Sequence, residues 1–316
     1  DAVLGDTYKQ YKISNSVVLD QVNKIYELGT HDRQLSEKFA QAMSILATDI
    51  KEEEIINIYG IDANYYYLTE SLCWPILKEI VEEKLMADPE QVNDRMRELS
   101  LKLPVDSDIQ IAIRFIEQSA LYYAQVRGLG TLKLNSTKEY IEKYTEEFYL
   151  VDLYYRRTLE AYHELITKEN PIEQTLSDAK HQLDLEYAKI TNVLNLEWLT
   201  CVGEKGAWFT ETGLKRQEDF YKNESDTSVK QVVIVCDALR YEVAKELMQE
   251  LAKEKHIATI DAYQAMLPTE TKYCKSALLP HHSLELNGTD MMVDGTLLTT
   301  TEQRTAHLGK YREGAI

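Results

Sequence analysis

The sequence predicts an α+β protein, in which a mostly α-helical N-terminal region precedes the beginning of an α/β domain with a parallel sheet. Two observations predict this class. From Ser16 to about Asn223, apolar residues recur at helical spacing. After Lys230, a continuous β-branched run at 231–236 precedes an amphipathic helical pattern and a second strand-like run. We therefore expect a helical bundle region at 1–225 and the start of a truncated α/β domain at 226–316.

Composition excludes several classes of protein. The 316 residues, 44% of them hydrophobic, suffice for a buried core. We find neither a signal peptide nor a run of about 20 apolar residues that could span a membrane. The four cysteines form no CxxC pair, which favours reduced thiols in the cytoplasm. Acidic residues outnumber basic ones 53 to 35, mostly before Val229, which disfavours general nucleic-acid binding.

The helical region is predicted to contain several helices without a regular repeat. The first begin near Ser16 and Asp32, and two long helices are separated at Asn170-Pro171, where proline breaks the pattern. Many of the 21 tyrosines lie at helical spacing, and we expect their rings to pack between helices. The remaining predicted segments are 67–86, 91–103, 109–126, 136–166 and 172–202. An irregular helical bundle follows from this pattern.

Asp237 lies directly after the predicted strand at 231–236. The helical pattern at 242–254 and the strand-like run at 256–263 then imply a right-handed parallel crossover. Functional groups of open α/β sheets gather beyond the carboxyl ends of the strands. A carboxylate there can bind a metal, accept a phosphoryl group or cap the following helix, and these interpretations remain open.

Two threonines follow the second predicted strand, in the segment 266–274. A hydroxyl at a strand-to-helix turn lies beside free N–H groups that favour negative charge on phosphate. Thr271 could therefore act as a nucleophile, if a metal or a base activates it. Alternatively, Thr271 or Thr269 could serve as the N-cap of the next helix.

The combination of Asp237 with the Pro-Thr-x-Thr motif resembles the first half of an alkaline phosphatase superfamily site. The resemblance is closest to PglZ-type proteins of BREX phage-defence systems. It is carried by VVIVCDALRYEVAKELMQEL and MLPTETKYCKSALLPH, with weaker matches at VDGTLLTTTEQR and EEFYLVDLYYRRTLEAYHEL. It implies that Asp237 and Thr271 bind a divalent metal, usually zinc. It also implies that Thr271 is the nucleophile that forms a phospho-enzyme, with Thr269 as the weaker candidate.

The resemblance is incomplete. The later Asp and His ligand motifs of the superfamily are missing, so we expect this chain to be part of a longer protein and to be weak or inactive alone. Arg240 either contacts phosphate or is an exposed charge in the first helical turn. We assign no metal to the later histidines and aspartates, because the adjacent histidine pair predicts a helix terminus or surface loop. These residues are His281, His282, His307, Asp290 and Asp294.

Three functional hypotheses remain. The first is a cytoplasmic, metal-dependent phosphohydrolase of phosphomonoesters or phosphodiesters, nucleic acid included, without membrane association. The resemblance implies partners in a defence system, such as a methyltransferase, an ATPase or a small accessory subunit. The second is a non-catalytic helical module that docks another defence protein. The third, a receiver-like domain phosphorylated at Asp237, is disfavoured because the acidic cluster it requires is missing there.

Overall fold

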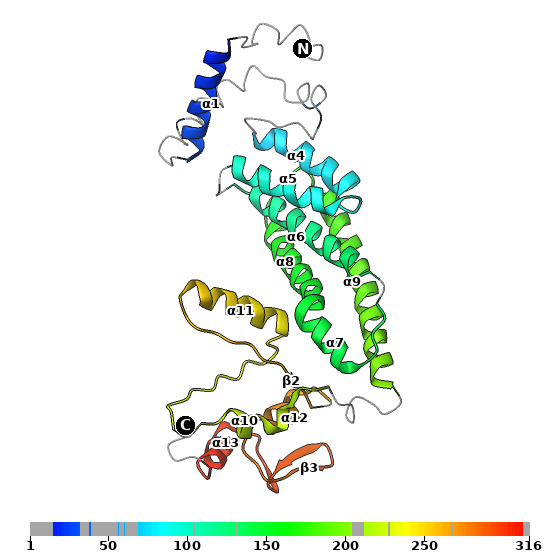
Figure 1. Ribbon diagram of the computed structural model, residues 1–316, viewed down its shortest axis with the longest axis vertical. Coiled ribbons are helices and arrows are strands. Elements are labelled where there is room, and N and C mark those ends of the chain that lie inside the picture. The colour runs from blue at the N-terminus through cyan, green and yellow to red at the C-terminus, as the bar shows by residue number, and fades with distance from the viewer. Residues whose placement is uncertain are drawn as a thin grey trace. The chain divides into compact units, whose positions relative to one another are not determined.

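The computed structural model of the chain describes residues 15–31, 38, 56, 60, 69–103, 105, 107–130, 132–203, 212–226, 228–266 and 268–311 (Figure 1). The chain forms two compact units. The first comprises residues 1–130 and 150–192, and the second comprises 131–149 and 193–316. The helix expected near Asp32 and the tyrosines at 65–67 lie outside the described residues. The domain boundary near residue 225 stays a prediction.

Helices dominate the described part of the chain up to Val202. Thr69 begins one of them, because its hydroxyl accepts a hydrogen bond from the N–H of Leu72. Asp88 caps another in the same way, with Pro89 at the first helical position. The predicted break at Asn170-Pro171 is confirmed, since it separates α8 from α9. The helical elements are α1 (Ser16–His31), α4 (Glu70–Glu79), η2 (Ile80–Lys84), α5 (Pro89–Lys102), α6 (Ile109–Gly128), α7 (Thr137–Lys143), η3 (Tyr144–Phe148), α8 (Tyr149–Leu165) and α9 (Glu173–Val202).

The first unit has a continuous apolar core between its helices. Met96 of α5, Phe115 of α6 and Leu183 of α9 are each fully buried in it. Tyrosines also pack between these helices, as expected from their spacing. Tyr155 stacks on Tyr187 with ring centroids 3.6 Å apart, and its hydroxyl donates to Asp184 over 3.1 Å. Burial of apolar surface at these positions supplies the main driving force for folding of the unit.

The second unit contains the strands. β1 (Lys215–Arg216) pairs in parallel with β2 (Tyr263–Gln264), in the register Lys215↔Tyr263. An antiparallel sheet follows, with β3 (Leu284–Asn287), β4 (Asp290–Val293) and β5 (Thr296–Leu297) in that order. The short helices are η6 (Gln217–Asp219), α10 (Phe220–Glu224), α11 (Tyr241–Lys253), α12 (Thr271–Ala277) and α13 (Thr301–Leu308). The predicted α+β class, with a helical N-terminal region, is confirmed.

Two tight turns connect the antiparallel strands. Asn287 pairs with Asp290, which leaves a two-residue loop that begins at Gly288, with φ +64°. Val293 pairs with Thr296 around Asp294 and Gly295, whose φ values are +47° and +73°. Two consecutive positive φ angles match the twist of the flanking strands, and Asp-Gly is a preferred pair for such a turn.

One prediction about the parallel sheet is wrong. The run 231–236 forms no strand, and its side chains are exposed, with Val232 at 77% and Ile234 at 80%. The parallel partner of β2 is instead β1, and only Tyr263 of the run 256–263 belongs to a strand. A central parallel strand needs a hydrogen-bonding neighbour on each side and cover on both faces. The described residues give the run 231–236 neither, so the crossover inferred from it is not formed.

The length and polarity of a helix decide whether it could cross a membrane. Among the residues that the structure describes, every helix is too short or too polar to cross a bilayer.

Candidate active site

The two residues that the sequence analysis singled out lie next to each other. The hydroxyl of Thr271 donates a hydrogen bond to Oδ2 of Asp237 over 3.1 Å. Both residues are exposed, so a substrate can reach them from solvent. A carboxylate that accepts a hydrogen bond from a hydroxyl fixes the direction of the O–H bond and can take up the hydroxyl proton. The pair therefore has the geometry of a nucleophile with an adjacent base, and its role remains a prediction.

A strained turn places the carboxylate. Ala238, directly after Asp237, has φ +58°, a value that residues with a Cβ rarely adopt. The turn lies between the extended run and α11, whose N-cap is Arg240 without a side-chain capping bond. Asp237 is thus not the cap of the following helix, and its carboxylate faces Thr271 instead. Strain of this kind persists only where surrounding structure maintains it.

Thr271 is the first residue of α12, and Glu270 is the N-cap, again without a side-chain capping bond. Neither Thr269 nor Thr271 therefore fills the capping role that was the alternative interpretation. The proximity of the two loops is also evident at Cys274, one turn along α12. Burial raises the pKa of this thiol, and the negative charge of Asp237 raises it further.

Gln217 holds α12 against the end of β2. Its amide oxygen accepts from the N–H of Met266 over 3.0 Å, and its amide nitrogen donates to the carbonyl of Cys274 over 3.2 Å. Met266 also packs with Ala277 and Met291 in a small apolar cluster. The position of Thr271 thus depends on a residue more than fifty positions earlier. Sequence reasoning missed Gln217, because an isolated glutamine in a polar segment carries no local signal.

Arg240 is engaged by the protein itself. Its Nη2 atom lies 2.6 Å from Oε1 of Glu242, whose side chain is fully buried, while the Arg240 side chain is 52% exposed. The guanidinium is therefore oriented by a buried carboxylate, and part of it still faces solvent. This geometry allows a phosphate contact and does not show one. In the sequence, Glu242 is marked only by its position two residues after Arg240.

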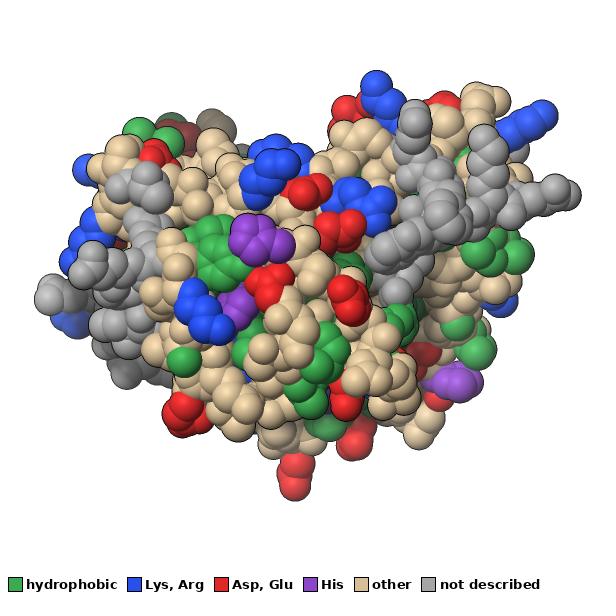
Figure 2. All heavy atoms as spheres, turned by 90° about the horizontal axis from the view of Figure 1, so that it is seen from below, with side chains coloured by type: hydrophobic (Ala, Val, Ile, Leu, Met, Phe, Trp, Pro, Cys, Tyr) green, Lys and Arg blue, Asp and Glu red, His purple; other side chains and the backbone are tan. Residues whose placement is uncertain are grey.

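A further cation lies beside Thr271. The ammonium of Lys272 is 3.4 Å from Glu270 and 4.6 Å from the ring centroid of Tyr273. The hydrogen bond with Tyr273, and then the charge of Glu270, raise the pKa of Lys272, so it stays protonated at neutral pH. On the face drawn in Figure 2, basic and acidic side chains are likewise mixed. The carboxylate of Glu270 thus partly neutralises the positive charge of Lys272 beside Thr271.

His281, His307 and Asp294 make contacts within the segment from Leu279 to Tyr311. A ring nitrogen of His307 lies 2.6 Å from the carbonyl oxygen of Pro280, and His281 contacts the carbonyl of Leu279 over 2.7 Å. Asp294 accepts from the Tyr311 hydroxyl over 2.5 Å and from the N–H groups of His282 and Ser283. The Tyr311 hydroxyl, followed by these two N–H groups, lowers the pKa of Asp294 to about 2.

The site does not fit a complete metal centre. In the part of the chain that the structure describes, no group of three or more His, Cys, Asp or Glu side chains is placed to hold a cation. Structural and catalytic zinc sites use at least three protein ligands. Asp237 and Thr271 supply two oxygen atoms at most. A third protein ligand of these types would have to come from outside the described residues.

Comparisons with known proteins show what the C-terminal part of the chain is similar to. Residues 218–316 match the model of the BREX system PglZ alkaline phosphatase-like domain. Asp237 and Thr271 both lie within the matched residues, and the matched domain is of the class that their motifs resemble. Residues 218–316 are therefore similar to a PglZ-type domain, and the resemblance stated from sequence is confirmed.

Two curated relatives extend the match into the helical region. The alkaline phosphatase-like protein PglZ of Bacillus cereus (strain H3081.97) is 29% identical over 209 residues, which cover 62% of this chain and 24% of the relative. The alkaline phosphatase-like protein BrxZ of Escherichia coli O9:H4 (strain HS) is 26% identical over 266 residues, which cover 79% and 30%. The chain therefore spans about a quarter to a third of each relative. No solved structure matches the chain.

Proposed function

We propose that this chain carries the nucleophile of a phosphohydrolase that acts in the cytoplasm as part of a BREX phage-defence system. The observation that carries the proposal is the 3.1 Å hydrogen bond from Thr271 to Asp237, in a domain of the alkaline phosphatase-like class. A hydroxyl is a poor nucleophile until a base or a metal lowers its proton affinity. Asp237 is placed to accept that proton while the Thr271 oxygen bonds to the phosphorus of a monoester or diester. The phosphorus–oxygen bond to the leaving alcohol breaks in the same step, and the alcohol departs as its alkoxide or takes a proton from solvent.

Asp237 and Thr271 are also the expected first ligands of a divalent cation, with zinc as the leading candidate. Such a cation would activate the hydroxyl and neutralise charge on the phosphoryl group. The part of the protein that does not touch the reacting atoms would contact other defence proteins, such as a methyltransferase, an ATPase or a small accessory subunit. These partners are proposed from the resemblance to PglZ-type proteins. The chain covers only 24% and 30% of the two relatives, so the partners of the whole protein are a proposal.

The central test is the covalent intermediate. The protein is incubated with bis(p-nitrophenyl) phosphate or p-nitrophenyl phosphate, with and without zinc, quenched in acid and analysed by peptide mass spectrometry. We expect phosphate on Thr271 from the monoester, or a p-nitrophenyl phosphate group from the diester, and neither after Thr271→Ala. Thr269→Ala is the matched control, since Thr269 is also exposed and lies two residues before Thr271 in the same segment. Phosphate on Thr269 would reassign the nucleophile, and phosphate on neither would refute the mechanism.

The metal is tested separately by its stoichiometry. Asp237→Ala should lower the zinc content of the protein, measured by atomic emission after dialysis, while circular dichroism stays unchanged. Asp261→Ala is a control, because Asp261 is an exposed aspartate of the same unit that lies outside the proposed site. Equal zinc content in Asp237→Ala and the parent protein would remove Asp237 from the ligand set.

A further inference from the structure

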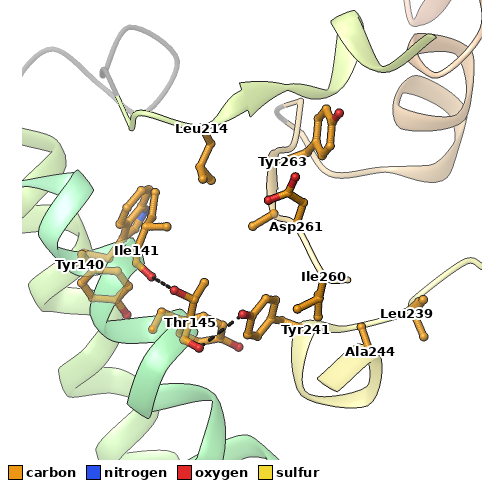
Figure 3. A pocket seen from close by; sticks show the side chains of 13 residues that line it. Tyr140, Ile141, Thr145, Leu214, Leu239, Tyr241, Ala244, Ile260, Asp261 and Tyr263 are labelled. Atoms are coloured by element: carbon orange, nitrogen blue, oxygen red, sulfur yellow. Dashed lines mark hydrogen bonds between the residues drawn. The ribbon is translucent and has the colours of Figure 1, made fainter. Parts of the chain in front are cut away.

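A cavity of about 520 Å³ lies in the second unit, within the 300–1,000 Å³ range of ligand pockets (Figure 3). One side of it is formed by the end of α7 and by η3, with Trp198 of α9. The other side is formed by the start of α11 and the segment that enters β2. These walls all belong to the same compact unit.

Aromatic rings make up much of the wall. They are contributed by Tyr140, Tyr144, Trp198, Tyr241 and Tyr263. Several of the hydroxyl groups already have protein partners: Tyr140 donates to the carbonyl of Leu194 over 3.1 Å, and Tyr241 donates to that of Thr145 over 3.3 Å. Tyr263 is bound to Glu224. Lys215 lies over the Tyr263 ring and Lys245 over the Tyr241 ring, with the ammonium groups 5.6 and 5.4 Å from the centroids. What these residues offer a ligand is the part of their ring surface that faces the cavity, on which planar heterocycles stack.

Asp261 supplies a polar contact. Its carboxylate is 79% exposed and lies 4.0 Å from the ammonium of Lys215. Thr145, another polar residue of the wall, already donates its hydroxyl to the carbonyl of Ile141 over 2.9 Å. An ionised carboxylate only accepts hydrogen bonds. The cavity thus combines ring surfaces with an acceptor, which suits a planar ring that carries N–H donors.

The cavity borders the candidate active site. Leu239 lines it, and this residue follows Asp237 by two positions. Even a fully extended chain keeps the Cα atoms of these residues within about 7 Å. Asp237 and Thr271 do not line the cavity, but its wall at Leu239 therefore lies close to Asp237, whose carboxylate accepts from Thr271. One molecule could occupy both places if it carries a planar ring at one end and a phosphate ester at the other.

We propose that the cavity holds the amine-bearing base of a nucleotide whose phosphate ester lies at Asp237 and Thr271. The phosphate end of this proposal rests on the proposed function, whereas the base end rests on the cavity alone. The formal charge of −18 opposes a long polyanion, so the site is suited to a single nucleotide unit and not to a duplex.

The test uses adenosine, which has a base and no phosphate, so that the cavity is examined apart from hydrolysis. Adenosine should quench the fluorescence of Trp198 in a saturable way, and Trp198→Phe should remove this signal. Ribose should produce no change. Tyr263→Ala should weaken adenosine binding by between about 5-fold and 150-fold, the usual effect of losing one stacking ring. Quenching by ribose to the same extent, or none by adenosine, would overturn the proposal.

A cavity-filling variant protects the test against misfolding. Ala244→Leu inserts a larger side chain into the wall without removing a contact, and should abolish adenosine quenching. Ala252→Leu makes the same change at an exposed position of α11 and should leave quenching unchanged. Equal effects of the two variants would show that the base binds elsewhere.

The role of Asp261 is tested by purine riboside, which lacks the exocyclic amine of adenosine and has no N–H donor on its base. The parent protein should prefer adenosine, and Asp261→Ala should bind both nucleosides equally. An unchanged preference would remove Asp261 from the site. Adenosine binding without formation of phosphothreonine would refute the proposed function and leave the base pocket standing. Formation of phosphothreonine without adenosine binding would refute the base pocket and leave the proposed function standing.

Discussion

Gln217→Ala should release α12 from the end of β2 and so loosen the position of Thr271. The substitution removes two hydrogen bonds, from the Met266 N–H and to the Cys274 carbonyl. Each neutral hydrogen bond contributes about 0.5–1.5 kcal/mol, so the local cost is about 1–3 kcal/mol. Met266 is only 7% exposed, which makes water a poor substitute partner for its N–H. The opening equilibrium at Met266 should therefore increase by about 5-fold to 150-fold.

Amide hydrogen exchange measures this effect directly. The Met266 N–H should exchange faster in Gln217→Ala by that factor. The N–H of Leu176, which bonds to the Ile172 carbonyl in the first unit, should be unaffected. Gln217→Glu separates the two bonds, because a carboxylate still accepts from Met266 and cannot donate to Cys274. Unchanged exchange at Met266 in Gln217→Ala would refute the inference that this side chain holds the two segments together.

Three further predictions concern other parts of the chain. The folded-state pKa of Asp294, about 2, lies below its ordinary value of 3.8. The stabilising effect of the ionised carboxylate is therefore complete above about pH 4 and is lost as the pH falls towards 2. Amide exchange of residues 284–297 should show this loss, and Tyr311→Phe should make the loss smaller. Burial raises the pKa of Cys73 to about 12, so at pH 8 iodoacetamide should modify the exposed Cys236 well before Cys73, as followed by peptide mass spectrometry. Leu183→Ala should cost about 2–5 kcal/mol in the unfolding of the first unit by urea, because Leu183 is fully buried; Leu185→Ala, 44% exposed in the same helix, should cost much less, and equal losses would contradict the core described above.

The helices could be predicted from sequence because their signals are local. The segment 172–202 differs by one residue from α9, and the segment 109–126 ends two residues before α6 does. Proline at 171 and the capping residues Thr69 and Asp88 act within a few positions of the helix end that they define. Such interactions need no knowledge of the rest of the fold.

Strand pairing was less predictable. The run 231–236 has the composition of a buried strand, yet pairing depends on partners that composition does not specify. The antiparallel strands at 284–297 were not predicted, although Asn287-Gly288 and Asp294-Gly295 are hairpin turn signals that lie between short apolar runs. These dipeptides could have revealed the hairpin.

The candidate pair was found from sequence because motif resemblance carried long-range information. The apolar pattern marked Asp237 only as the residue after a predicted strand that does not form, and the approach of Asp237 to Thr271 spans segments of irregular chain. The supporting residues Gln217 and Glu242 were not found. Their importance depends on which backbone groups they face, and this is visible only after folding.

The exposed run 231–236 has a practical consequence for experiments on Asp237. Short uncharged stretches rich in valine and isoleucine promote self-association when open to solvent, and flanking charges oppose it. Lys230 and Asp237 are the charges that border this run. Replacing Asp237 by alanine or asparagine removes one of these gatekeepers, so lost activity in such variants should be compared with their state of aggregation by light scattering. Asp237→Glu keeps the charge and is the informative companion variant.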